Sequence, residues 1–154
     1  MICINTSRAA CDSEQPQGAE VVDSVSAAMR SDIMSRVRSK DTRPEMLVRR
    51  LIHGAGFRYR LHVRGLPGSP DLVFSGRKKV IFVHGCFWHS HPGCRHARIP
   101  KSRPDFWIAK LSTNRVRDER NVQALVDAGW KVMVLWECEL RDPELMTRIR
   151  EFLL

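Results

Sequence analysis

The segment His84–Cys94 concentrates side chains that can do chemistry. Histidines, cysteines and the aromatic pair Phe87-Trp88 follow one another there, directly after the apolar run Val80–Val83. Histidine titrates near neutral pH, and cysteine thiolate is a soft metal ligand. Such residues seldom crowd one loop by chance. We therefore predict that this segment is the functional centre of the chain and that a buried strand holds it in place.

Part of this segment has the short spacing of metal ligands. Cys138, at the end of a later apolar run, can add a fourth ligand, and three cysteines with one histidine form a closed structural zinc site. His96 and His89 are alternatives for the histidine, and Cys138 as a small buried hydrophobe is the alternative for that residue. The predicted zinc ligands are Cys86, His91, Cys94 and Cys138.

Asp71 follows Pro70 at the start of a predicted strand. If this strand and the next form a hairpin, the Asp71 carboxylate lies beside the Val83 carbonyl and His84. Carboxylate and carbonyl oxygens are hard ligands that suit a Mg²⁺ ion sharing the phosphate oxygens of a substrate. A simple turn is the alternative interpretation of Pro-Asp taken by itself.

If zinc takes His91, then His84 and His89 are free to act as a general base or to orient water. Asp118 or Glu119, on a long basic helix, can supply the carboxylate that orients the base. Surface histidines with no task are the alternative.

The aromatic pair Phe87-Trp88 stands between a candidate zinc ligand and a candidate base. This placement predicts a position at a rim, where aromatic side chains wedge between base steps of nucleic acid. Trp107 is a third candidate for such a wedge, with a place in the core as its alternative.

The elements that must position these residues follow from periodicity and capping signals. We expect helices over 31–40, from Thr42 to about Gly54, over 105–129 and over 143–154, and strands over 57–62, 71–74, 79–83 and 131–136. Thr42 and Glu45 have capping-box spacing. This order predicts an α/β fold, a mixed β-sheet flanked by helices. The apolar faces are predicted to bury Leu47, Val48, Leu51, Ile52 and Ala55, then Ile108, Leu111, Val122, Leu125 and Val126, and finally Leu145, Met146, Ile149, Phe152 and Leu153.

The 154 residues fit one domain, predicted over 29–154, after a mobile tail over 1–28. The net charge of +9 favours a polyanionic partner, with a basic protein that binds nothing in particular as the alternative. Two basic blocks, 30–64 and 95–120, flank the central segment, which favours nucleic acid. The sequence shows neither an apolar run of membrane-spanning length nor a secretory leader, so we expect a cytoplasmic protein without disulfides.

With these residues, the chain resembles a known family, the very short patch repair (Vsr) DNA mismatch endonucleases. The resemblance runs from about Met29 to Leu140. It rests on several short segments: Met34-Ser35-Arg36 with Asp41-Thr42, Leu66–Asp71, His84–His89, Phe106-Trp107, Arg117-Asp118 and Trp136-Glu137-Cys138.

The resemblance implies a restriction-endonuclease-like fold with a structural zinc site. It implies Mg²⁺-dependent nicking of double-stranded DNA on the 5′ side of the T in a T:G mismatch, the product of 5-methylcytosine deamination. The implied roles are Asp71 and the Val83 carbonyl for Mg²⁺, His89 as base held by Asp118, Glu45 and His84 ordering water at the metal, Cys86, His91, Cys94 and Cys138 for Zn²⁺, and Phe87, Trp88 and Trp107 as wedges.

We expect a monomer, with other repair proteins as candidate partners. Two other functions compete with mismatch nicking. One is an endonuclease of the same fold without mismatch preference. The other is a zinc-stabilised DNA-binding module in which Asp71 is only a turn residue.

Overall fold

The computed structural model describes residues 26, 28, 29, 32, 35 and 40–154. The predicted tail over 1–28 and the predicted helix over 31–40 lie almost wholly outside the described residues. From Lys40 onward, the expected mixed sheet with flanking helices is present, and it places the chain in the α/β class.

The sheet is built around β2 (Lys79–His84), which pairs with a neighbour on each side. β1 (Leu72–Phe74) runs antiparallel to β2 and brings Leu72 opposite Ile81, which confirms the predicted hairpin. The short 3₁₀ helix η1 (Ser75–Arg77) forms its turn. β3 (Lys131–Trp136) lies parallel to β2, from Lys79 beside Lys131 to His84 beside Trp136.

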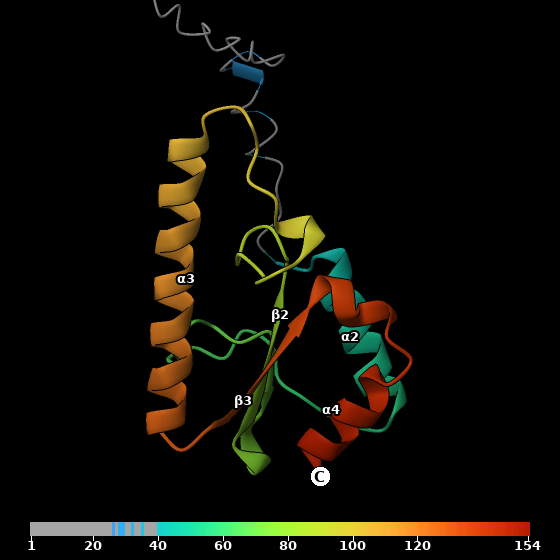
Figure 1. The fold of residues 1–154 in the computed structure, drawn as a ribbon. Helices are drawn as coiled ribbons and strands as arrows, with labels where there is room; N and C mark the ends of the chain where they lie inside the picture. Colours follow the sequence, from blue (N-terminus) through green and yellow to red (C-terminus); the bar gives the residue numbers. More distant parts are fainter. Residues whose placement is uncertain (1–25, 27, 30–31, 33–34, 36–39) are drawn as a thin grey trace, which may run out of the picture.

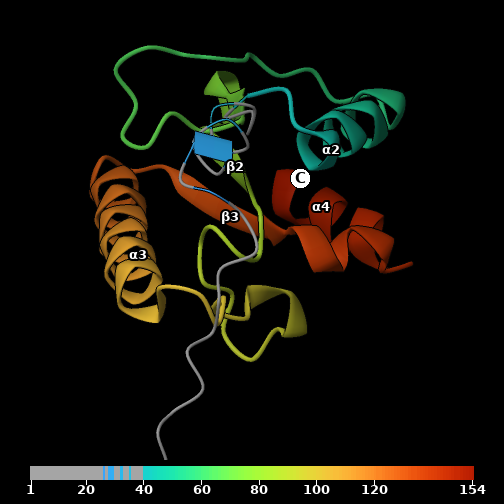
Figure 2. The same ribbon diagram turned by 90° about the horizontal axis from the view of Figure 1, so that it is seen from above.

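Helices cover both faces of this sheet (Figures 1 and 2). α3 (Pro104–Asp127) lies along one face, and α2 (Arg43–Gly54) and α4 (Leu145–Leu153) pack together on the other. Successive residues of a strand point to opposite faces. On β2, therefore, Ile81 and Val83 pack toward α2 and α4, whereas Val80 and Phe82 pack toward α3. His84 follows this alternation and points to the α3 side, where it contacts Phe82.

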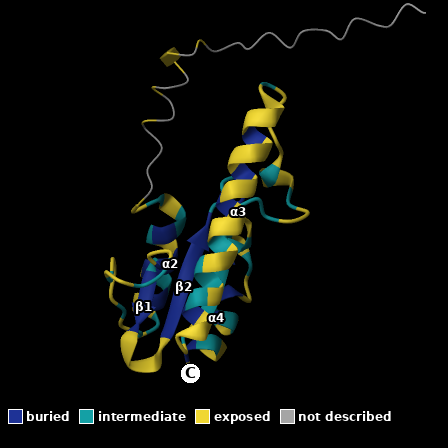
Figure 3. Cartoon of the chain, turned by 90° about the vertical axis from the view of Figure 1, so that its left-hand side faces the viewer, coloured by how far each residue is buried: buried dark blue, intermediate teal, exposed yellow. Residues whose placement is uncertain are grey.

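β2 is buried along its whole length, whereas α3 exposes most of its surface (Figure 3). The side chains of α3 that are buried follow the period of the helix: Trp107, Leu111, Asn114 and Leu125. Two other short 3₁₀ helices complete the fold, η2 (Arg95–Ala97) after the central loop and η3 (Glu137–Arg141) after β3. None of the described helices is long and apolar enough to cross a membrane.

Three predicted core positions are wrong. Ile108 and Val126 are 52% and 48% exposed, because each follows the buried face of α3 by one residue, about 100° around the helix. Leu47 is 41% exposed, since α2 turns a face toward the core that includes the charged residues Glu45 and Arg49.

The predicted strand over 57–62 is reduced to one antiparallel bridge between Arg60 and Val73. β1 is short, and His62 adopts a left-handed backbone with φ 52°, which is incompatible with a continuing strand. The predicted alternation of exposure is nevertheless present from Phe57 to Arg60.

Candidate active site and metal centre

A cleft of about 1290 Å³ opens at the carboxyl end of β2. Its walls come from the first turn of α2, the loop over 62–71, the end of β2 and one face of α3. Asp71, His84, His89, Asp118 and Glu45 all line it, together with Val83. The fold thus gathers in one cleft the predicted acids and bases that are far apart in the sequence.

Asp71 stands at the start of β1, where the hairpin brings it beside the end of β2. Its Oδ2 accepts a hydrogen bond of 2.7 Å from the backbone N–H of Val83. The N–H and C=O of one strand residue point to the same side, so the Val83 carbonyl faces the side on which the Asp71 carboxylate lies. The pKa of Asp71 is raised to about 6, mainly by burial and further by the charge of Glu45, whereas the hydrogen bond from Val83 lowers it. This carboxylate lies where a cation would offset its charge.

His84 and His89 stack on each other, with ring centroids 3.8 Å apart and ring planes 7° from parallel. Burial lowers the pKa of His84 to about 4, and the neighbouring His89 lowers it further. His84 is therefore neutral near pH 7. His89 Nδ1 lies 2.5 Å from Oδ2 of Asp118, which fixes Nδ1 as the protonated nitrogen and leaves Nε2 as a proton acceptor.

Asp118, not Glu119, is thus the carboxylate that faces His89. Glu119 pairs along the exposed surface of α3 with Arg115. Asp118 is 17% exposed and also contacts Arg117, at 3.2 Å from Oδ1. A carboxylate held between an arginine and a histidine ring is fixed in orientation.

A second cluster joins residues of the same loop to Cys138. The ligand atoms of Cys86, His91, Cys94 and Cys138 all lie within 4.8 Å of one another. His91 Nδ1 is 3.6 Å from Sγ of Cys86 and 3.3 Å from Sγ of Cys138. Tetrahedral zinc with bonds of about 2.3 Å separates sulfur ligands by about 3.8 Å, so this donor set fits zinc. Neither alternative histidine, His89 or His96, belongs to the cluster.

The histidine of this cluster, His91, is supported by an aromatic contact. The His91 ring stacks on Trp136 at the end of β3, with centroids 4.1 Å apart and planes at 7°. Burial raises the pKa of the Cys86 thiol, whereas the backbone of His96 lowers the pKa of the Cys94 thiol. The cluster joins the loop after β2 to η3 after β3, so a metal there would tie the two segments together.

The aromatic side chains form a third group. Phe87 and Trp88 are partly exposed, with rings 5.1 Å apart, and both lie edge-on to Trp107 at 5.3 and 6.1 Å. Trp107 is only 9% exposed and supports the pair from α3, whereas its neighbour Phe106 is 48% exposed.

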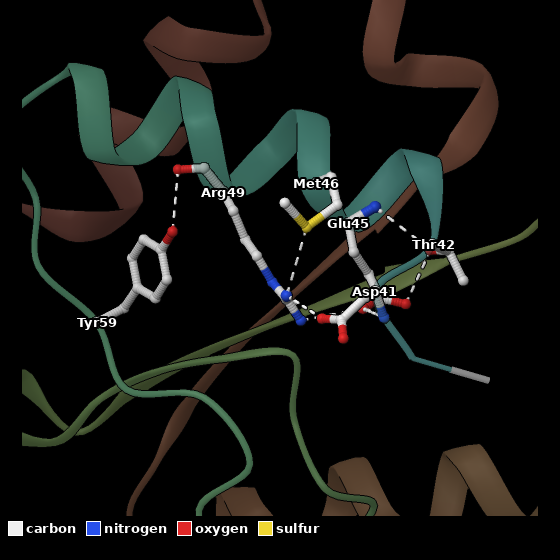
Figure 4. A network of polar contacts seen from close by, with 6 residues as sticks. All are labelled: Asp41, Thr42, Glu45, Met46, Arg49 and Tyr59. Atoms are coloured by element: carbon white, nitrogen blue, oxygen red, sulfur yellow. Dashed lines mark hydrogen bonds and ion pairs between the residues drawn. The ribbon is translucent and has the colours of Figure 1, made fainter. Parts of the chain in front are cut away.

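Glu45, in the first turn of α2, lines the cleft and is 5% exposed. Its carboxylate accepts hydrogen bonds from the Asp41 backbone N–H, the Thr42 hydroxyl and Arg49 (Figure 4). Thr42 caps α2 by accepting from the Glu45 N–H at 3.4 Å. The predicted capping box is therefore present in modified form, because Glu45 reaches Asp41 instead of the Thr42 N–H.

Sequence reasoning missed two polar residues of the site. Asn114 is 8% exposed and donates from Nδ2 to the Trp88 carbonyl at 3.1 Å, which ties the central loop to α3. Its place in the sequence could have indicated this role, because Asn114 lies seven residues after Trp107 and four before Asp118 and so shares a face of the helix with both. The other is Arg49, which does not line the cleft but contacts Glu45, one turn earlier on α2.

Comparisons with known proteins give one consistent result. The family model described as DNA mismatch endonuclease Vsr matches residues 22–96. The type II nicking enzyme V.XorIIP of Xanthomonas oryzae pv. oryzae is 52% identical over 134 residues, 86% of this chain and 98% of that protein.

Two further relatives span a similar part of the chain. The type II nicking enzyme V.NmeAIP of Neisseria meningitidis is 44% identical over 122 residues, 79% of this chain and 86% of that protein. The DNA mismatch endonuclease Vsr of Escherichia coli (strain K12) is 40% identical over 120 residues, 78% of this chain and 76% of that protein.

Proposed function

The chain belongs to the Vsr family of DNA mismatch endonucleases, and from this membership we propose that it nicks double-stranded DNA 5′ to the T of a T:G mismatch in a Mg²⁺-dependent reaction. That it is an endonuclease acting on DNA follows from the family itself. The observation that carries the finer proposal is the meeting, in one cleft, of the Asp71–Val83 contact with the His89–Asp118 pair.

Asp71 and the Val83 carbonyl would hold the Mg²⁺ ion. The fit rests on their hard oxygen donors and on the raised pKa of Asp71. When bound, Mg²⁺ supplies electrostatic stabilisation of the charge that develops on the phosphate. The hydrogen bond from Val83 holds Oδ2 of Asp71 in place and so aims the rest of the carboxylate into the cleft.

His89 is proposed as the general base. It would accept a proton from water at Nε2 while Asp118 holds its Nδ1–H and stabilises the positive charge that results. His84 stacks on this ring and stays neutral, so it can orient water without competing for the Asp118 charge. Glu45 would orient water from the wall of the cleft that α2 forms.

Zinc, held by the cluster Cys86, His91, Cys94 and Cys138, would fix the loop that carries both the base and the aromatics. Phe87 and Trp88 would then be rigid wedges for the base stack, and Trp107 would support them from α3. Trp107 is nearly buried, so it would act as a third wedge only after its side chain becomes exposed. Unstacking costs on the order of a few kcal/mol and least at a mismatch, so wedging gives selectivity before any base edge is read.

Several wider properties are part of the proposal. The basic residues of the cleft walls, among them Lys40, Arg64, Lys110 and Arg117, would contact the DNA backbone. We propose one catalytic domain over 29–154 with a restriction-endonuclease-like fold and a tail over 1–28. The protein would act as a monomer on cytoplasmic DNA, with repair proteins as candidate partners.

A nicking assay on matched duplexes tests this function. One sequence is offered as a T:G duplex and as a fully paired duplex, each with Mg²⁺ and with EDTA. We expect one nick, 5′ to the T, in the T:G duplex with Mg²⁺, and no cleavage in the other three reactions. Equal cleavage of both duplexes would indicate an endonuclease without mismatch preference, and tight binding without cleavage would indicate a DNA-binding module.

A further inference from the structure

Arg49 is a buried charged residue that has no role in the proposed reaction as derived from Asp71, His89 and Asp118. Its side chain projects from α2 and is 7% exposed. One guanidinium nitrogen lies 2.5 Å from Oδ1 of Asp41, and another lies 3.1 Å from Oε2 of Glu45 (Figure 4). Its Nε has no hydrogen-bond partner among the described residues. Because guanidinium cannot lose its proton in a protein, its burial is costly unless anions compensate for it.

Glu45 depends on Arg49 more than on its other partners. The Asp41 N–H at 2.9 Å and the Thr42 hydroxyl at 2.8 Å are neutral donors, and Arg49 is the cationic donor in the contacts described for this carboxylate. Glu45 lines the cleft, whereas Arg49 does not. Arg49 therefore reaches the cleft through Glu45.

The rest of the network fixes Arg49 itself. The hydroxyl of Tyr59 donates to the Arg49 carbonyl at 3.1 Å and anchors this turn of α2. Asp41 adopts a left-handed backbone, φ 54°, in which its N–H meets Glu45 and its carboxylate meets Arg49. The forked guanidinium contacts both carboxylates at once, a geometry that the single ammonium of lysine does not reproduce.

We propose that Arg49 is a positioning residue that holds the Glu45 carboxylate in place at the wall of the cleft, so that Glu45 and Asp71 form a preformed acidic site for a divalent cation. The inference rests on the proposed Mg²⁺-dependent reaction. Electrostatics support it: the charge of Glu45 raises the pKa of Asp71 and the charge of Arg49 lowers it, so both charges act at the same place.

The variant Arg49→Lys tests this, with Arg50→Lys as the matched control on the adjacent, exposed position. Mn²⁺ binding, the Mg²⁺ concentration for half-maximal nicking, the affinity for T:G duplex in EDTA and Tm are measured for each. We expect Arg49→Lys to weaken metal binding and to raise the Mg²⁺ requirement about tenfold, the effect of one lost charge-assisted hydrogen bond. Duplex affinity in EDTA should not change, and Arg50→Lys should match the wild type.

A double-mutant comparison separates positioning from simple stabilisation. If Arg49 acts through Glu45, then Glu45→Gln/Arg49→Gln should bind metal as Glu45→Gln alone does. This comparison also decides the matter if Arg49→Lys does not fold. Further weakening in the double variant, or a lower Tm with an unchanged metal requirement in Arg49→Lys, would overturn the inference alone. A wild-type protein that neither binds metal nor nicks would overturn the proposed function as well.

Discussion

At the scale of single residues, the buried carboxylate of Asp71 should have opposite effects on stability and on the proposed catalysis. Its pKa is raised to about 6 by burial, from an ordinary 3.8. The folded protein therefore binds this proton more tightly than the unfolded chain, and the metal-free protein gains stability from this group as the pH falls from about 6 toward 4.

Asp71→Asn should therefore abolish nicking and yet stabilise the metal-free fold. Asparagine can still accept the Val83 hydrogen bond, and it carries no charge. We expect Tm to rise at pH 8, by the equivalent of at most about 2–3 kcal/mol, and the difference to fade by pH 4. Thermal melts at both pH values and a T:G nicking assay check this. Nicking at the wild-type rate would exclude Asp71 as a metal ligand.

The stacked pair His84 and His89 should differ in function. His89→Ala removes the proposed base and should slow nicking by about 10²–10⁴-fold, whereas His84→Ala should cost less, because the proposed role of the neutral His84 is only to orient water. Asp118→Asn should lose as much as His89→Ala, and the double variant no more than either. Single-turnover rates at neutral pH measure this. Similar mild losses in all three would leave the metal as the whole mechanism.

At the scale of elements, the cysteine cluster brings together the loop after β2 and η3, and the proposed zinc ion would hold them there. Cys138→Ser should lose the bound metal and lower Tm, since structural zinc contributes directly to folding. Cys138 is exposed, so serine is accommodated sterically. His96→Ala, nearby and outside the cluster, is the control and should keep its metal. Metal analysis of the folded, active wild type should give about one zinc per chain, and finding none would refute the site.

Sequence periodicity predicted the elements that depend on local pattern. The hairpin of β1 and β2, strand β3 and the cap at Thr42 were all expected and are present. What local pattern cannot supply is which side of a helix meets the sheet. Ile108 was misplaced for this reason.

The candidate site divides in the same way. Residues such as His89 and Cys94 were found by type and spacing, because their chemistry is specific and they share one loop. Asn114 and Arg49 were missed, because a polar residue becomes informative only once its burial is known, and burial depends on contacts between elements.

At the scale of the whole molecule, the aromatic pair decides between mismatch recognition and general DNA binding. Phe87→Ala and Trp88→Ala should each weaken binding to T:G duplex by roughly 1–3 kcal/mol, the usual value of base–aromatic stacking, or about one to two decades in affinity. Binding to matched duplex should change little, since phosphate contacts dominate there.

These affinities must be measured on variants whose zinc content and Tm match the wild type. Phe106→Ala is a useful control, because Phe106 is exposed on α3 and contacts Trp107 without belonging to the pair. If T:G and matched duplexes lose affinity equally, the pair is a general contact and the mismatch preference needs another origin.

The parallel pairing of β2 with β3 has a consequence for folding kinetics. Lys79 lies beside Lys131, so the connection between the two strands contains the whole central loop and α3. Closing so long a connection costs chain entropy before the strand contacts repay it, and such non-local pairing is slow. During refolding, α3 can become helical early, whereas the cleft and the cysteine cluster can form only after β3 has paired with β2. Nicking activity should therefore return later than helix content.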